Sequence, residues 1–172
     1  MTLATKITAS RLLAVPLLLY WLQSPTATEQ WLALGIFLLA AGTDWLDGYV
    51  ARRLNQVSDL GKFLDPLVDK LLVLAPLIAL VELRVLPAWG VFLILARELA
   101  VAGWRVTPTL QAAGVPGANL WGKAKTGVQI LAIALLLAPL PAPWPDIAQV
   151  SFWLAVVLTW VSGVVYLWPK SS

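Results

Sequence analysis

Two pairs of aspartates interrupt an otherwise apolar part of the chain. Asp44 and Asp47 lie in one apolar segment, and Asp65 and Asp69 lie in the next. Four carboxylates that converge in a site of low dielectric repel one another and are driven to take up protons. One divalent cation relieves that repulsion, and two relieve it more fully. The residue types and their spacing therefore indicate a site for divalent metal ions.

The residue types that are absent narrow the chemistry further. The 172-residue sequence contains no Cys and no His, which excludes thiolate nucleophiles, imidazole bases and Cys-ligated zinc. A general base must then be a carboxylate, Lys, Tyr or water. Metal ligands must be oxygen atoms, which favour hard cations such as Mg²⁺ or Mn²⁺.

Long apolar runs make up most of the chain and must position these acids. Hydrophobic residues are 60% of the sequence and charged residues only 12%, a balance typical of integral membrane proteins. A membrane-spanning helix needs about 20 apolar residues. The sequence predicts an all-α fold, an integral membrane bundle of six transmembrane helices in a single domain over residues 1–172. The expected spans are roughly Ile7–Gln23, Trp31–Leu54, Leu60–Val81, Ala88–Val106, Trp121–Leu140 and Ile147–Trp168. No cleavable signal peptide is expected.

The basic residues predict the orientation of these spans. With the N-terminus in the cytoplasm, only Arg84 falls in an external connection. The acidic stretch then lies at the cytoplasmic ends of the second and third spans. The basic residues expected at that face are Lys6, Arg11, Arg52, Arg53, Lys62, Lys70, Arg97, Arg105, Lys123 and Lys125, with Lys170 also inside at the C-terminus.

Helical spacing places several residues on the same helix faces as the four aspartates. At about 100° per residue they fall on two stripes: Asp44, Asp47, Gly48, Ala51 and Arg52 on the second span, and Gly61, Asp65 and Asp69 on the third. Ser58 followed by Asp59 is a plausible N-terminal cap for the third span. Helices joined by so short a turn are neighbours, so the two stripes are expected to face each other.

The stretch from Asp44 to Asp69 fits the pattern D-x2-D-G-x2-A-R-x8-G-x3-D-x3-D at every position. In this it resembles the CDP-alcohol phosphatidyltransferase family, whose signature this is. The resemblance implies binding of the CDP part of a liponucleotide and of two divalent ions, Mg²⁺ or Mn²⁺. It implies metal ligands at Asp44, Asp47, Asp65 and Asp69, with Asp69 also the candidate catalytic base, and CDP-binding residues at Gly48, Ala51, Arg52, Ser58 and Gly61.

The acceptor alcohol is predicted from basic residues outside the motif. Arg97 and Arg105 lie on the fourth span, and Lys123 and Lys125 lie at the start of the fifth, where Asn119 is a candidate cap. Helix N-termini and Lys side chains bind anions, so together these residues favour an anionic acceptor. Taken singly, each is as easily a membrane anchor whose charge reaches the lipid headgroups. Glu98 either pairs with a Lys of this pocket or holds Arg97; the sequence leaves both open.

From Ile7 to Leu137 the chain is similar to the branch of the family that joins CDP-diacylglycerol to glycerol 3-phosphate. "TDWLDG", "FLDPLVDK", "ARELAV" and "GKAKT" carry that similarity, and Arg11 matches an Arg of the branch's opening segment. The implied products are phosphatidylglycerophosphate and CMP. The implied acceptor-phosphate residues are Arg11, Arg97, Arg105, Lys123 and Lys125.

The resemblance also implies a setting for the enzyme. We expect a multi-pass protein of the cell inner (plasma) membrane with its active site facing the cytoplasm, in contact with membrane lipids and forming a homodimer. No nucleic-acid partner is expected. The alternatives are a relative that makes inositol-phosphate lipids or cardiolipin and, from another class, a cation- or proton-coupled transporter. A transporter would place its charges near mid-membrane in several spans, whereas here they gather at one face.

Overall fold

The computed structural model describes the backbone of residues 3–54, 59–106 and 120–167, and the side chains of residues 10–43, 66–104 and 122–164. Within these ranges the chain is helical and contains no strand. The helices are α1 (Leu3–Trp21), α2 (Ala27–Leu54), α3 (Asp59–Glu82), α4 (Ala88–Val106), α6 (Leu120–Leu137) and α7 (Trp144–Leu167). The prediction of an all-α fold is confirmed, with six helices in the described residues; that all six are transmembrane helices stays a prediction.

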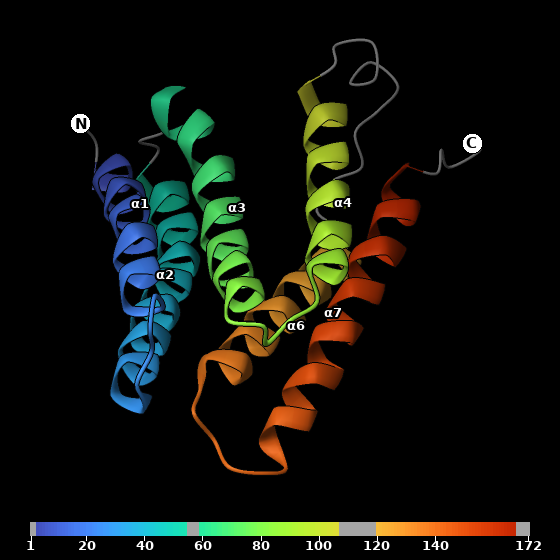
Figure 1. The fold of residues 1–172 in the computed structure, drawn as a ribbon. Helices are drawn as coiled ribbons and strands as arrows, with labels where there is room; N and C mark the ends of the chain where they lie inside the picture. Colours follow the sequence, from blue (N-terminus) through green and yellow to red (C-terminus); the bar gives the residue numbers. More distant parts are fainter. Residues whose placement is uncertain (1–2, 55–58, 107–119, 168–172) are drawn as a thin grey trace.

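The helices form two groups. Figure 1 shows α1, α2 and α3 side by side, with α4, α6 and α7 gathered on the other side of the molecule. Helix α1 packs on α2 and α3, and α7 packs on α6 and α4. Contacts of α2 and α3 with α6, and of α3 with α4, join the two groups. Helices α2 and α3 also contact each other, as their short connection requires.

A continuous apolar core runs through both groups. It includes Leu18 from α1, Phe37 from α2, Leu77 from α3, Ile133 from α6 and Phe152 from α7, each at most 1% exposed. Large apolar side chains also cover much of the outside, which suits a protein surrounded by lipid. Within the described residues, only Trp144–Val164 of α7 is a helix both long and apolar enough to cross a membrane by those two criteria.

Two glycines let helices approach closely around α7. A Cβ atom added at Gly90 of α4 would lie 2.9 Å from ring atoms of Phe152. A Cβ atom added at Gly163 of α7 would lie 3.1 Å from Cγ and Nε of Arg97. Small residues permit close helix packing in membrane proteins. Here they bring α4 against α7 and lay the Arg97 side chain across the α7 backbone.

Local signals explain why some helix ends differ from those predicted by apolarity. Helix α2 begins at Ala27, four residues before the expected Trp31, because Thr26 and Glu29 form a capping box. The Thr26 amide donates to Glu29 Oε2 at 2.6 Å, and the Glu29 amide donates to Thr26 Oγ1 at 3.4 Å. Helix α7 begins at Trp144 rather than Ile147, with Pro and Asp in its first turn, where both residues are favoured.

The end of α3 has the geometry of a Schellman motif. The Val85 amide donates to the carbonyl of Leu80 and the Arg84 amide donates to that of Val81, both at 2.9 Å. This arrangement needs a left-handed residue, and Arg84 fills that position with φ of 58°. The motif turns the chain directly into the short connection before α4.

Candidate active site

The four motif aspartates lie on two helices that contact each other. Asp44 and Asp47 are in the C-terminal part of α2, and Asp65 and Asp69 are in the N-terminal part of α3. The side chains of Asp44, Asp47 and Asp65 lie outside the described residues, so their predicted convergence stays a prediction. The C-terminal part of α2 and the N-terminal part of α3, which carry these four residues, lie at the same end of the helix pair (Figure 1).

The residues predicted to bind CDP also lie on α2 and α3 or between them. Gly48, Ala51 and Arg52 are in α2, and Gly61 is in α3, but their side-chain environments lie outside the described part of the structure. Ser58 lies wholly outside it. Helix α3 begins at Asp59, one residue after Ser58, which is where a cap at Ser58 would start it.

Asp69 is described, and it is held by Arg11. The Arg11 guanidinium, from α1, donates through Nη1 to Asp69 Oδ1 at 3.0 Å. The Arg11 side chain is 2% exposed and that of Asp69 is 47% exposed. A buried cation thus fixes one end of the acidic stripe while the carboxylate stays accessible. Arg11 therefore contacts one of the motif acids, and its predicted role in binding the acceptor phosphate stays a prediction.

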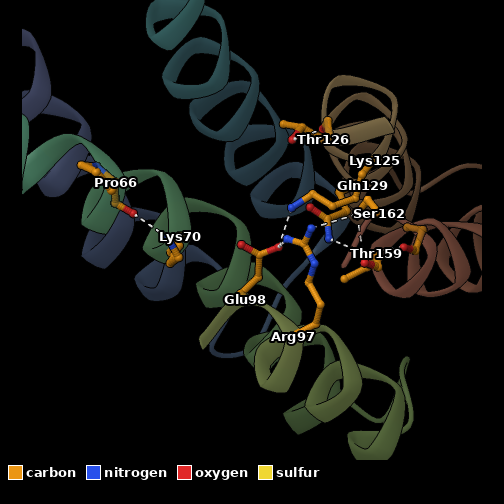
Figure 2. A network of polar contacts seen from close by, with 11 residues as sticks. Pro66, Lys70, Arg97, Glu98, Lys125, Thr126, Gln129, Thr159 and Ser162 are labelled. Carbon is orange, nitrogen blue, oxygen red and sulfur yellow. Dashed lines mark hydrogen bonds and ion pairs between the residues drawn. The ribbon is translucent and has the colours of Figure 1, made fainter. Parts of the chain in front are cut away.

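The second charged cluster centres on Glu98 (Figure 2). Its Oε1 accepts one hydrogen bond from Arg97 Nη1 at 3.0 Å and another from Lys125 Nζ at 2.5 Å. Arg97 and Glu98 come from α4 and Lys125 from α6. All three are largely buried, with side chains 10%, 14% and 10% exposed. Both open alternatives for Glu98 are thus realised at once: it pairs with a Lys of the pocket and holds Arg97.

Helix α7 completes the support of this cluster. Arg97 Nη2 donates to Ser162 Oγ at 3.0 Å, and Ser162 Oγ donates to the carbonyl of Thr159 at 2.9 Å. Beside it, Gln129 Nε2 of α6 donates to Thr159 Oγ1 at 2.9 Å. The guanidinium is therefore fixed from two directions, by α4 through Glu98 and by α7 through Ser162.

The remaining predicted basic residues differ in their surroundings. Lys123 is exposed on the first turn of α6, and the Arg105 side chain lies outside the described residues. Lys70, on α3 directly after Asp69, lies near enough for its charge to act on both Glu98 and Lys125. Its Nζ donates to the carbonyl of Pro66 at 3.4 Å, as Figure 2 shows. Lys70 thus lies beside Arg97, Glu98 and Lys125, which together form what we call the cationic cluster.

The site can therefore be divided by chemistry into two parts. One part offers carboxylate oxygens on α2 and α3, the donor set that Mg²⁺ or Mn²⁺ prefers. The other offers Arg97 and Lys125 against the single negative charge of Glu98, with Lys70 nearby on α3, an excess of positive charge suited to an anion. Among the side chains that the structure describes, no group of three acids forms a metal site, because three of the four motif carboxylates are not among them.

Comparison with known proteins identifies the family. Residues 1–161 match the family model of CDP-alcohol phosphatidyltransferase. The chain belongs to the CDP-alcohol phosphatidyltransferase family. The match extends well beyond the aspartate motif and takes in α1, α4 and α6, which carry Arg11, Arg97, Glu98 and Lys125.

Individual relatives show which members it is similar to. It is 51% identical over 138 residues to the CDP-diacylglycerol–glycerol-3-phosphate 3-phosphatidyltransferase of Bacillus subtilis, covering 76% of this chain and 69% of that protein. The enzyme of the same name from Pseudomonas fluorescens is 35% identical over 177 residues, covering 98% and 86%. A CMP-forming cardiolipin synthase of rice, Oryza sativa subsp. japonica, is 35% identical over 185 residues, covering 98% and 55%.

Several residues of the cationic cluster were missed by sequence reasoning. Lys70 was assigned only to the cytoplasmic face, although its position next to Asp69 in the chain was a signal. Ser162, Thr159 and Gln129 gave no signal, because single polar residues in apolar helices commonly serve as interhelical hydrogen-bond partners. Their relation to Arg97 depends on how α7 crosses α4 and α6, which spacing along one helix does not reveal.

Proposed function

We propose that this protein transfers the phosphatidyl group of CDP-diacylglycerol to glycerol 3-phosphate, giving phosphatidylglycerophosphate and CMP. The observation that carries the proposal is the complete eight-residue motif on two contacting helices, in a chain 51% identical to a Bacillus subtilis enzyme named for this reaction. The acceptor hydroxyl oxygen forms a bond to the phosphorus that bears the diacylglycerol. The bond from that phosphorus to the CMP oxygen breaks, and the hydroxyl proton passes to a base.

The acidic stripes are proposed to hold two divalent ions, Mg²⁺ or Mn²⁺, through Asp44, Asp47, Asp65 and Asp69. The residues fit such ions, because every ligand on offer is a carboxylate oxygen and the sequence provides no His or Cys. Bound ions would supply charge neutralisation at the pyrophosphate and at the departing CMP. Gly48, Ala51 and Gly61 leave room for the cytidine, and Arg52 contacts the pyrophosphate. Ser58 belongs to the same CDP-binding set.

Asp69 is the proposed general base. Its carboxylate is about half exposed, so a substrate hydroxyl can reach it. The hydrogen bond from buried Arg11 orients the carboxylate and favours its ionised form. An ionised, oriented carboxylate next to the reacting phosphorus can accept the hydroxyl proton as the new bond forms. Arg11 is thus proposed to act on Asp69, in addition to its predicted place among the residues that bind the acceptor phosphate.

The cationic cluster is proposed to bind the phosphate of glycerol 3-phosphate. Arg97 and Lys125 reach one point from α4 and α6, and Lys70 adds a third positive charge from α3. Arg105 and Lys123 complete the proposed set. Binding of the phosphate by these residues would orient the acceptor hydroxyl for in-line attack on the phosphorus that bears the diacylglycerol. The free energy of binding the phosphate would thus be used to orient the reacting group.

A specific observation supports one alternative acceptor. The similarity to the rice cardiolipin synthase covers almost the whole chain at 35% identity, so the family match alone does not choose between acceptors. The acceptor in cardiolipin formation is phosphatidylglycerol, a phosphodiester with one negative charge, whereas glycerol 3-phosphate is a monoester with up to two. The excess positive charge around Glu98 favours the monoester.

We further propose the membrane arrangement. All six helices span the cell inner (plasma) membrane, with the N-terminus, the motif and both charged clusters at the cytoplasmic face and Arg84 outside. The distribution of basic residues supports this orientation. The apolar outer faces suit contact with membrane lipids, and a homodimer is the proposed assembly.

Release of CMP by the purified protein tests the reaction class. The wild-type protein in detergent with CDP-diacylglycerol, glycerol 3-phosphate and Mg²⁺ or Mn²⁺ is expected to release CMP, and a chelator is expected to stop it. Asp65→Asn should abolish release while the protein stays folded by circular dichroism. Retained turnover in Asp65→Asn would contradict the ligand role. Uptake of ions into vesicles without any CMP release would favour a transporter instead.

A further inference from the structure

One carboxylate oxygen joins two cations from different helices. Glu98 Oε1 accepts from Arg97 Nη1 at 3.0 Å and from Lys125 Nζ at 2.5 Å. The two nitrogens can therefore lie no farther apart than the sum of these distances, which lets both contact one phosphate group. Without the shared negative charge, two largely buried cations this close would repel each other and separate. The geometry of the pair thus depends on Glu98.

Both cations keep hydrogen-bond donors for a ligand. A guanidinium has five N–H donors and an ammonium has three. Arg97 uses Nη1 on Glu98 and Nη2 on Ser162, and its buried Nε has no hydrogen-bond partner within the described residues. Lys125 uses one donor on Glu98. Glu98 therefore holds Arg97 and Lys125 in place and leaves N–H donors on both free to bind a ligand.

We propose that Glu98 is a positioning residue for the anionic acceptor: it holds Arg97 and Lys125 together so that both can bind one phosphate group. This inference rests on the proposed function of the site. Glu98 does not contact the reacting atoms in this account. It acts through the two cations, and it also removes one unit of the excess positive charge from their surroundings.

Two simpler roles make different predictions. If Glu98 only ties α4 to α6, its loss should destabilise the fold and weaken the use of both substrates alike. If it only occupies the place of the ligand, its loss should release the cations and strengthen acceptor binding. A positioning residue should weaken acceptor use selectively, and an isosteric substitution that keeps the accepting oxygen should restore part of it.

The test compares Glu98→Gln and Glu98→Ala with wild type. Gln retains an oxygen that accepts both hydrogen bonds but lacks the charge, whereas Ala lacks both. We expect Glu98→Ala to raise the KM for glycerol 3-phosphate at least about tenfold and Glu98→Gln to raise it less. The KM for CDP-diacylglycerol should change by less than about twofold in both variants. Glu82→Ala is the matched control, since Glu82 is exposed at the last turn of α3, and it should behave as wild type.

Calorimetric titration of glycerol 3-phosphate into each purified variant gives a readout independent of turnover. Weaker binding in the order wild type, Glu98→Gln, Glu98→Ala supports the proposal. Equal effects on both substrates, or tighter acceptor binding in either variant, would overturn it. If wild-type protein neither binds nor uses glycerol 3-phosphate, the proposed function fails first. The same series with inorganic phosphate as the titrated anion then still decides whether Glu98 organises the two cations.

Discussion

Replacing Ser162 with alanine removes the hydrogen bond by which α7 holds Arg97. Ser162 is 1% exposed and Arg97 is 9% exposed, so water does not readily replace the lost hydroxyl. Arg97 would then keep only its bond to Glu98, and its buried Nε already has no partner in the described part of the chain. The guanidinium is expected to turn away from the position that it shares with Lys125.

The size of the effect follows from the kind of bond removed. Hydrogen bonds to charged groups contribute about 1.5–3 kcal/mol in proteins, whereas interhelical side-chain bonds measured inside a membrane protein average about 0.6 kcal/mol. A charged donor inside a helix bundle lies between these values, so we expect a loss of about 1–2 kcal/mol. This corresponds to a fall in Tm of about 2–8 °C for a chain of this length.

The assay measures Tm in detergent and the KM for both substrates. If about 1 kcal/mol of the loss falls on the acceptor site, the KM for glycerol 3-phosphate rises about fivefold while that for CDP-diacylglycerol stays unchanged. Ser151→Ala is the control, because Ser151 Oγ donates to the carbonyl of Ile147 within α7 itself. Indistinguishable behaviour of the two variants would refute the conclusion that Ser162 fixes Arg97.

Two further predictions concern helix ends outside the predicted spans. Arg84→Gly should raise the free energy of unfolding by about 0.5–1 kcal/mol, because Arg84 adopts φ of 58° and glycine adopts this angle without strain. Arg84→Ala should not raise the free energy of unfolding. If it did, relief of backbone strain would be excluded as the cause. Hydrogen bonds from the Thr26 amide and hydroxyl lower the pKa of Glu29. The stability that they provide is therefore present above the ordinary Glu pKa and is lost as pH falls through the lowered value. Glu29→Gln should accordingly lower Tm at neutral pH and have no effect in acid, and a difference that persists in acid would contradict this.

The helices were predictable because their apolar runs are long and their breakers are distinct. The bounds of α4 were predicted as found, and the start of α3 within one residue. Helix ends that depend on capping were displaced, as at Ala27, because apolarity does not report the Thr26–Glu29 pair. Helix α6 ends at Leu137, earlier than the expected Leu140, because Pro139 disfavours the helical conformation at Ala138 directly before it.

The motif could be read completely from one continuous stretch of sequence, since its spacing carries the information. The cationic cluster could be read only in part. Arg97 and Lys125 stood out as charges in apolar helices, but the sharing of Glu98 depends on how α4 lies against α6. The role of Ser162 depends in turn on the close approach that Gly163 allows. Contacts of this kind arise from tertiary packing and leave no periodic signal in a single sequence.

Incorporation of glycerol 3-phosphate into lipid distinguishes the proposed acceptor from the alternatives. Purified protein in detergent is supplied with CDP-diacylglycerol, a divalent ion and glycerol 3-phosphate labelled at its phosphorus, and the organic-phase lipid and the released CMP are both measured. We expect labelled lipid and CMP to form in equal amounts. Release of CMP with phosphatidylglycerol as acceptor, and no label entering lipid from glycerol 3-phosphate, would contradict it.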